Sequence, residues 1–135
     1  MREILFRGKP KNLKAYGWVY GQLLYHSEEM SKIYSDEIDS PVGVIPDTVG
    51  QFTGLTDKNG KKIFEGDIVR VCLDPEICIG DVIWDSEIAS YNIPFSNGKC
   101  VLPLDIFIAK NKVGDKVWIE VIGNIYDNPE LLEGD

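Results

Sequence analysis

Apolar and polar residues alternate with a period of two along several short stretches of the chain. The clearest are residues 68–72 (IVRVC) and 117–122 (VWIEVI), in which successive side chains would point to opposite faces of a pleated strand. Residues 17–25 (GWVYGQLLY) are rich in aromatic and branched side chains, which suit a half-buried sheet. No stretch has the long 3.6-residue repeat of an amphipathic helix. The pattern predicts a mainly β protein.

Glycine-bearing turns separate these stretches. Asn59-Gly60 lies between FTGLT and KKIF, and this dipeptide favours a two-residue type I′ hairpin turn, in which both central residues take positive φ. Gly-Asp pairs at residues 66–67, 80–81 and 114–115 precede β-rich runs, and we interpret each pair as a turn that leads into a strand. Their irregular spacing argues against a repeat protein.

Other segments have less regular patterns. Residues 27–37 (SEEMSKIYSDE) are charged and predict a loop or a helical turn. Residues 41–47 (PVGVIPD) contain two prolines, which favour an edge strand or an extended segment. Residues 86–99 predict a long loop or an irregular hairpin. Residues 100–109 predict a further strand, weakened by Pro103.

Several short strands joined by Gly-rich turns predict an all-β sandwich or a small barrel, and of these we expect a small SH3-like barrel or a β-roll. The 135 residues have the size of one domain. Within it we expect an additional N-terminal β layer over residues 1–50 and a barrel-like subdomain over residues 51–135. Asp127 or Asn128 can cap a short C-terminal helical turn that begins at Pro129.

Charge makes direct binding of nucleic acid unfavourable. The chain has 22 acidic and 14 basic residues and a net charge of −8, so it offers little attraction to a polyanion unless a local basic face exists. Basic residues cluster only in Arg7–Lys14 and Asp57–Lys62, and we interpret both clusters as solvated turns.

Cysteine usage and hydropathy indicate the compartment. Cys72, Cys78 and Cys100 form no Cys-x-x-Cys motif, and an odd number argues against a secreted disulfide framework. No apolar run approaches the length of a signal peptide core or a membrane span. We therefore expect a cytoplasmic protein that has no contact with a membrane.

The sequence contains no recognisable catalytic or metal-binding motif. His26 is the only histidine, and the cysteines lack the spacing of a zinc site. The loop around Gly60 is not an EF-hand, because Leu55 and Gly66 would occupy its first and last ligand positions. No Gly-Lys pair is followed by Ser or Thr, so there is no P-loop. We assign no catalytic, cofactor-binding or metal residue and expect a protein that is not an enzyme.

Carboxylates are the remaining candidates for chemistry: Glu65, Asp67, Asp81, Asp85 and Glu120. We interpret Asp67 and Asp81 as turn formers. A hydrolase would require Glu65, Asp67 or Glu120 to pair in one concave pocket. If these groups face separate regions, that hypothesis fails.

Aromatic residues could mark a binding face. Tyr16, Trp18 and Tyr20 alternate and would project to one side of a strand, where we expect core packing rather than an exposed recognition stripe. Tyr91 and Phe95 lie in the predicted 86–99 loop, and they would form a recognition surface if that loop is exposed.

Residues 48–69 (TVGQFTGLTDKNGKKIFEGDIV) resemble the signature of the YopX-like family of phage and prophage proteins. Two further segments agree with it: REILFRGK (2–9) with GWVYGQLL (17–24), and VIGNIYDNPELL (121–132). The resemblance implies a single β-rich domain over residues 1–135 and an association with temperate phages of bacteria. It implies no catalytic residues.

The leading hypothesis is a non-enzymatic phage accessory protein that binds a host or phage protein in the bacterial cytoplasm, or that assembles into a homo-oligomer through exposed strand edges. The alternative is a nucleic-acid-binding β-barrel that acts in phage replication or gene control. A further hypothesis, based on the acidic net charge, is that the protein mimics DNA. Such mimicry needs carboxylates along one face, whereas the carboxylates of this chain are dispersed among the predicted turns.

Overall fold

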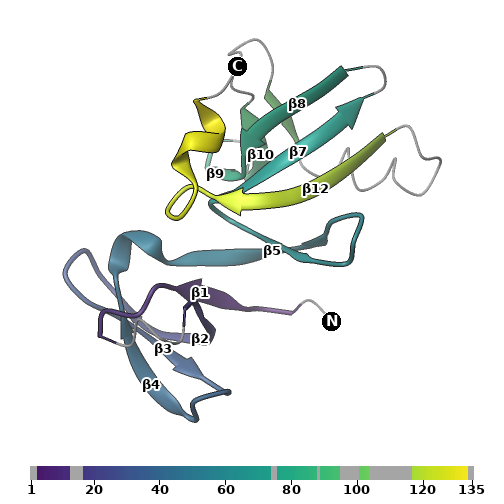
Figure 1. Cartoon of the computed structure of the whole chain (residues 1–135). Coiled ribbons are helices and arrows are strands. Elements are labelled where there is room, and N and C mark those ends of the chain that lie inside the picture. The colour runs from purple at the N-terminus through teal and green to yellow at the C-terminus, as the bar shows by residue number, and fades with distance from the viewer. Residues whose placement is uncertain are drawn as a thin grey trace. The chain divides into compact units, whose positions relative to one another are not determined.

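The computed structural model describes residues 3–12, 17–73, 76–87, 89–94, 101–103 and 117–133. These residues form antiparallel β-strands and two short 3₁₀ helices (Figure 1). The prediction of a mainly β fold is therefore confirmed. The chain divides into two compact units, Met1–Phe52 and Thr53–Asp135.

The first unit is one antiparallel sheet. Its strands lie in the order β4 (Ser40–Val44), β3 (Ser31–Ser35), β2 (Val19–His26), β1 (Phe6–Gly8) and β5 (Gly50–Thr56). A 3₁₀ helix, η2 (Pro46–Thr48), connects β4 to β5, which continues into the second unit. The prediction of an edge strand for residues 41–47 is confirmed for residues 41–44, because β4 is the last strand in this order, whereas Pro46 and Asp47 lie in η2.

This sheet curls back on itself. The segment that follows β1 bonds to β4: the Lys11 amide donates to the carbonyl of Gly43 at 3.0 Å, and the Ile45 amide donates to that of Lys9 at 2.8 Å. The enclosed core consists of the alternate, inward-facing side chains of β2, β3 and β4, namely Val19, Ile33, Val42 and Val44. The opposite face of the same strands therefore points away from this core.

Residues 27–37 do not form the predicted loop or helical turn, because they contain β3. Ser31, Ile33 and Ser35 are buried and alternate with exposed Lys32 and half-buried Tyr34. The charged residues flank the strand, and two of its three inward positions are serines. The alternation of buried and exposed residues therefore could not be recognised from hydropathy.

The second unit contains two three-stranded antiparallel sheets, β12-β7-β8 and β11-β10-β9. Their strands are β7 (Asp67–Leu73), β8 (Glu76–Asp81), β9 (Ile83–Asp85), β10 (Ser90–Pro94), β11 (Val101–Pro103) and β12 (Val117–Asn124), preceded by the end of β5 and by β6 (Lys62–Phe64). Residues from β6 and from both sheets form one core: Ile63, Val69, Val71, Val82, Ile93 and Ile119. Whether this unit is an SH3-like barrel stays a prediction.

Predictions at the C-terminal end of the chain have mixed outcomes. The short helical turn is confirmed as the 3₁₀ helix η3 (Pro129–Leu132), although the Asn128 side chain does not cap it. The Asn128 Oδ1 atom instead accepts a hydrogen bond from the Asn124 amide at 3.3 Å. Residues 86–99, predicted as a long loop or an irregular hairpin, contain β10, which pairs with β9. Residues 104–109 of the strand predicted over 100–109 lie outside the described residues.

The turn at Asn59-Gly60 is a hairpin turn, but it is not type I′. Gly60 has φ of +81°, whereas positive φ among described non-glycine residues occurs only at Asp39 and Ala89. The Gly60 amide donates to the Asp57 carbonyl at 3.0 Å, and the Asp57 amide donates to the Lys61 carbonyl at 2.8 Å. This is a longer loop that ends in a left-handed glycine, and only that one residue needs positive φ.

The Gly-Asp pairs have three different outcomes. Gly66, with φ of +86°, and Asp67 lead into β7 as predicted. Gly80 and Asp81 do not form such a turn, because they are paired inside β8 with Val69 and Ile68. The third pair, at residues 114–115, lies outside the described residues.

Candidate functional site

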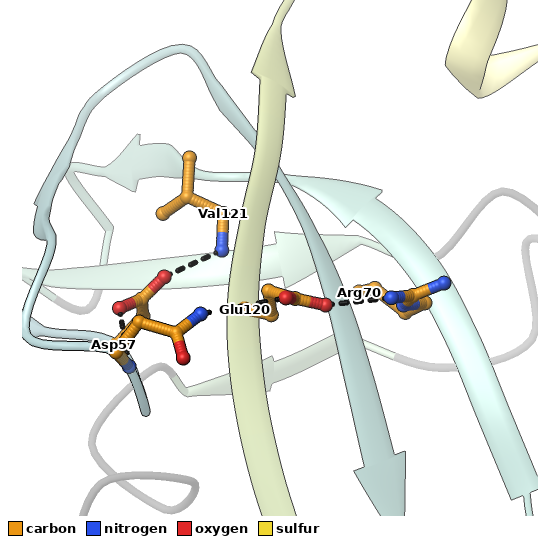
Figure 2. A network of polar contacts seen from close by, with 5 residues as sticks. Asp57, Arg70, Glu120 and Val121 are labelled. Atoms are coloured by element: carbon orange, nitrogen blue, oxygen red, sulfur yellow. Dashed lines mark hydrogen bonds and ion pairs between the residues drawn. The ribbon is translucent and has the colours of Figure 1, made fainter.

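Asp57 fastens the β5–β6 hairpin loop to the edge of β12 (Figure 2). Its Oδ1 atom accepts hydrogen bonds from the amides of Asn59 and Lys61, and its Oδ2 atom accepts one from the amide of Val121, each at 2.9 Å. The Lys58 amide adds a bond to the Ile119 carbonyl at 2.9 Å. Because Asp57 is only 6% exposed, its carboxylate satisfies amides that water reaches poorly. The polar loop around Gly60 therefore has a structural role: Asp57 holds the loop together and bonds it to β12.

Beside this loop, five side chains of the second unit form a surface that we name the Trp118 face: Lys58, Arg70, Ile77, Trp118 and Glu120. Across the strands, Trp118 is paired with Cys72 and Cys72 with Ile77, while Glu120 is paired with Arg70. Directly paired residues of antiparallel strands project to the same face of a sheet. The intervening residues, such as Val71 and Ile119, point to the core.

Two cations lie close to the Trp118 ring. The Lys58 Nζ atom is 4.1 Å from the ring centroid and the Arg70 Cζ atom is 5.9 Å from it, both within the range of a cation–π interaction. These contacts place positive charge directly beside an aromatic side chain.

Glu120 orients this cluster (Figure 2). Its Oε1 atom accepts a hydrogen bond from Arg70 Nη2 at 2.6 Å, and its Oε2 atom accepts one from Asn59 Nδ2 at 3.4 Å. The hydrogen bond from Arg70 and the charge of Lys58 hold the pKa of Glu120 below its ordinary value, against the opposing effect of burial. The ion pair therefore forms readily at neutral pH.

The Trp118 face is accessible at its apolar and its charged positions. Ile77 is 58% exposed, and the Arg70 side chain is 45% exposed. Trp118 is half-buried, and Lys58 is exposed together with Lys61 and Lys62 on the same hairpin. Periodicity predicted the strands of this face, but no motif in the sequence indicated that these side chains would meet.

Asp67 and Glu120 do not form a catalytic pair. Asp67 lies on the core side of β7 with Val69, and it accepts a hydrogen bond from the Phe64 amide at 2.8 Å. Glu120 is paired with Arg70, which points to the opposite face. This placement removes the Asp67–Glu120 pairing that a hydrolase could use.

Asp85 and Asp81 have different surroundings. Asp85 accepts hydrogen bonds from the Glu87 amide at 3.0 Å and from Asn92 Nδ2 at 3.1 Å, which is a structural use. Partial burial raises the pKa of Asp81 on β8. Across the described parts of the chain, no three His, Cys, Asp or Glu side chains gather into a group that could hold a metal ion.

The surroundings of His26, Cys72 and Cys78 indicate structural rather than catalytic positions. His26 Nδ1 lies 2.6 Å from the Ser31 hydroxyl, but Ser31 is fully buried and a substrate could not reach it. Among the described residues, neither Cys72 nor Cys78 is in a disulfide bond. They point to opposite faces of the sheet, because Cys72 is paired with Ile77 and Cys78 with Val71, so they cannot form a disulfide with each other. Cys100 lies outside the described residues.

The aromatic prediction for β2 is wrong at Tyr20. Tyr20 is 44% exposed, because Val19 and Gly21 are the residues that face the core. Trp18 precedes the strand and lies against Arg7, whose Cζ atom is 4.6 Å from the ring centroid. Tyr16 lies outside the described residues.

Tyr20 belongs to an outward surface that we name the tyrosine face: Tyr20, Tyr25, Lys32 and Tyr34. The strand register places them together, since Tyr25 is paired with Lys32 and Tyr34 with Gln22, two residues from Tyr20. The hydrogen bond that the Tyr34 hydroxyl donates to Asp39 raises the pKa of Tyr34.

The predicted pair Tyr91 and Phe95 is only partly described. Tyr91 lies in β10 and contacts the core of the second unit, and Phe95 lies outside the described residues. The partner of Tyr91 is Trp84, paired with it across β9 and β10 at 5.0 Å between ring centroids. Trp84 is 48% exposed, and no pattern in the sequence indicated it as a surface residue.

Segments of the sequence signature meet in space. In the first unit, β1 of REILFRGK pairs with β2 of GWVYGQLL and with β5 of TVGQF. In the second unit, Asp57 bonds to Val121, and the Ile125 amide donates to the Gly66 carbonyl at 2.9 Å. The signature residues therefore include those that hold each unit together.

The family comparison agrees with these segments. The profile of a family described as YopX protein matches residues 5–133, nearly the whole chain. A search of curated proteins gave no match. Within the described residues, no helix has both the length and the hydropathy needed to cross a membrane. The chain belongs to the YopX protein family.

Proposed function

We propose that this protein is a non-enzymatic binding module that recognises another protein through the Trp118 face. The observation that carries the proposal is that exposed Ile77, half-buried Trp118 and the oriented Arg70 share one face of a sheet. Tryptophan and arginine are enriched among the residues that dominate the energy of protein interfaces. The structural use of Asp57, Asp67 and Asp85 supports a role other than catalysis.

The setting of this function follows from the resemblance and the composition. We place the protein among phage or prophage accessory proteins that act in the cytoplasm of the bacterial host, with a host or phage protein as partner. Acidic charge and the odd number of cysteines support this placement.

A pull-down with purified variants tests the proposal. Bait proteins would be the wild type, Ile77→Asp and, as matched control, Leu24→Asp, which alters an exposed leucine (53% exposed) of the first unit. A partner recovered from phage-carrying cells by the wild type and by L24D, but lost with I77D, is the expected result. Recovery of no specific partner, or equal recovery with I77D, would contradict the proposal.

The partner can also be a second copy of this chain. In that case light scattering of the wild type at high protein concentration gives a mass above that of the monomer, and I77D returns it to the monomer mass. A strict monomer at every concentration would remove the homo-oligomer.

A second candidate function, binding of single-stranded nucleic acid, is favoured by the tyrosine face. Exposed tyrosines beside Lys32 combine rings on which bases can stack with a cation for phosphate. Binding of a labelled oligonucleotide should then weaken steeply between about 50 and 200 mM salt and should be lost on Tyr20→Ala with Tyr25→Ala. Absence of binding at low salt would exclude this function.

A further inference from the structure

We infer that the Trp118 face takes an extended acidic peptide segment, with apolar side chains of the peptide on Trp118 and Ile77 and its carboxylates on Lys58 and Arg70. The inference rests on the proposed function, because it names the chemistry of the protein segment that the same face would bind.

The apolar part of the face is a row that crosses three strands. Trp118 of β12, Cys72 of β7 and Ile77 of β8 are paired in register. Since neighbouring strands lie about 4.8 Å apart, the row spans roughly 10 Å. Side chains on one side of an extended peptide recur about every 7 Å, so apolar side chains two or four residues apart, roughly 7 or 13 Å, bracket this distance.

The charged part of the face is positive. On the Trp118 face, Lys58 and Arg70 contribute two positive charges and Glu120 one negative charge, in a chain whose net charge is −8, and Lys61 and Lys62 are exposed on the same hairpin as Lys58. Asp81, on the same side of β8 as Ile77, lies at the opposite end of that strand. The Asp57 carboxylate is buried in its loop and bonded to three amides. Glu76 points to the other face, because it is one residue from Ile77 on the same strand. Positive charge is thus concentrated beside the apolar row.

Arg70 and Lys58 keep donors for a ligand. An arginine has five N–H donors, and Glu120 accepts from the Nη2 atom of Arg70, so the exposed remainder of the guanidinium can meet a second carboxylate. The bonds of Glu120 to Arg70 and Asn59 hold the arginine in place before binding. Such preorganisation lowers the entropy cost of binding.

A peptide fits this surface better than a nucleic acid. Lys58 lies over the Trp118 ring, where a base would have to stack. A polyphosphate that extends beyond this face places further negative charges against a chain whose net charge is −8, whereas a short peptide keeps its few carboxylates within the screening distance of about 8 Å from Lys58 and Arg70. Exposed Ile77 adds an apolar contact that suits a side chain of a peptide.

Fluorescence anisotropy with three matched peptides tests the inference on the full chain. Each labelled peptide has about twelve residues and repeats Leu-Ser-X-Ser, where X is Glu, Gln or Lys, so that Leu and X share one side of an extended chain. We expect the Glu peptide to bind at least about tenfold more tightly than the Gln peptide, and the Lys peptide to bind most weakly.

Variants locate the binding. Lys58→Glu should remove most of the preference for the Glu peptide, and the double variant K61E/K62E should reduce it; all three lysines are exposed. Ile77→Ser should weaken the Glu and Gln peptides alike. The matched control Lys11→Glu, on an exposed lysine of the first unit, should leave all three affinities unchanged.

The inference is overturned if no peptide binds, if the Gln or Lys peptide binds as tightly as the Glu peptide, or if K58E leaves the order unchanged. Displacement of the Glu peptide by single-stranded DNA of equal length would assign the face to nucleic acid instead. If the pull-down partner still depends on Ile77 while the peptides show no acidic preference, only this inference fails. If that partner is also indifferent to I77D, the proposed function fails with it.

Discussion

At the scale of single residues, Asp57 explains why a polar, glycine-containing stretch lies in the centre of the chain. Its two oxygens satisfy the amides of Asn59 and Lys61 in its own loop and the amide of Val121 on a distant strand. A carboxylate is the side chain that can accept all three bonds without offering a competing donor.

Asp57→Ala should lower the free energy of unfolding by about 3 kcal/mol, because three amides lose a charged acceptor in a buried place. Asp57→Asn, which keeps one carbonyl oxygen, should cost less. Urea unfolding measures both. The control is Lys61→Ala, which shortens an exposed side chain of the same loop and keeps its backbone amide, and an equal loss in D57A and K61A would contradict the role of the carboxylate.

Glu120 makes stability depend on acid pH. Its pKa in the folded protein lies below the unfolded value of about 4.3, so its stabilising effect is full above that value and is lost as the pH falls through the folded pKa. Glu120→Gln should therefore be less stable than the wild type at pH 7, and the gap should close on acidification below the unfolded pKa.

The measurement is thermal unfolding of both proteins from neutral pH into the acid range. Screening by solvent and salt limits the size of the effect, and high salt should reduce the gap at pH 7. A gap that stays constant across this pH range would show that the Glu120 side chain acts through packing rather than charge.

At the scale of elements, Gly60 and Gly66 distinguish the energetic cost of backbone strain from that of steric crowding. Gly60 and Gly66 both have positive φ, but a Cβ at Gly60 would meet no atom within 4 Å, whereas one at Gly66 would lie 3.1 Å from Tyr126 Cε2. Gly43, in β4, has neither positive φ nor a neighbour within 4 Å of such a Cβ. The three positions therefore form a graded series.

Alanine at each position should follow that grading. Gly43→Ala should change the free energy of unfolding by less than about 0.5 kcal/mol. Gly60→Ala should cost about 1 kcal/mol through strain alone, and Gly66→Ala more, because the Tyr126 ring must also move. Chemical denaturation of the three variants checks the order, and a G60A loss as large as that of G66A would contradict it.

At the scale of the whole molecule, each unit has its own hydrophobic core. Ile33 is fully buried in the first core and Ile119 in the second. The residues of each of these two cores therefore pack within their own unit.

Ile33→Ala and Ile119→Ala should each cost about 3 kcal/mol, since both remove buried methyl groups and leave a cavity. Hydrogen exchange should rise mainly in residues 3–52 for I33A and mainly in residues 53–133 for I119A. An equal rise across both ranges in either variant would show that the two cores unfold as one cooperative unit.

Strand positions and fold class could be predicted from the sequence, because alternation of side chains and turn-forming residues are local properties. Residues 68–72 and 117–122 lie in β7 and β12 as their alternation indicated, and residues 17–25 overlap β2. The prediction was wrong where local signals were weak or ambiguous: β3 has serines at two inward positions, and Gly80-Asp81 continues a strand instead of turning.

By itself, the sequence determined that this is a β protein with a hairpin at Asn59-Gly60 and a short turn after Pro129, since glycine, proline and alternating residues restrict the backbone wherever they occur. Only the tertiary structure decided the type of that hairpin turn, through the bond from Val121 to Asp57, and the outward position of Tyr20. It also decided the Trp118 face, because strand register brings residues about 50 positions apart, such as Arg70 and Glu120, into contact. Register depends on how whole strands bury their apolar sides, which no short stretch of sequence contains.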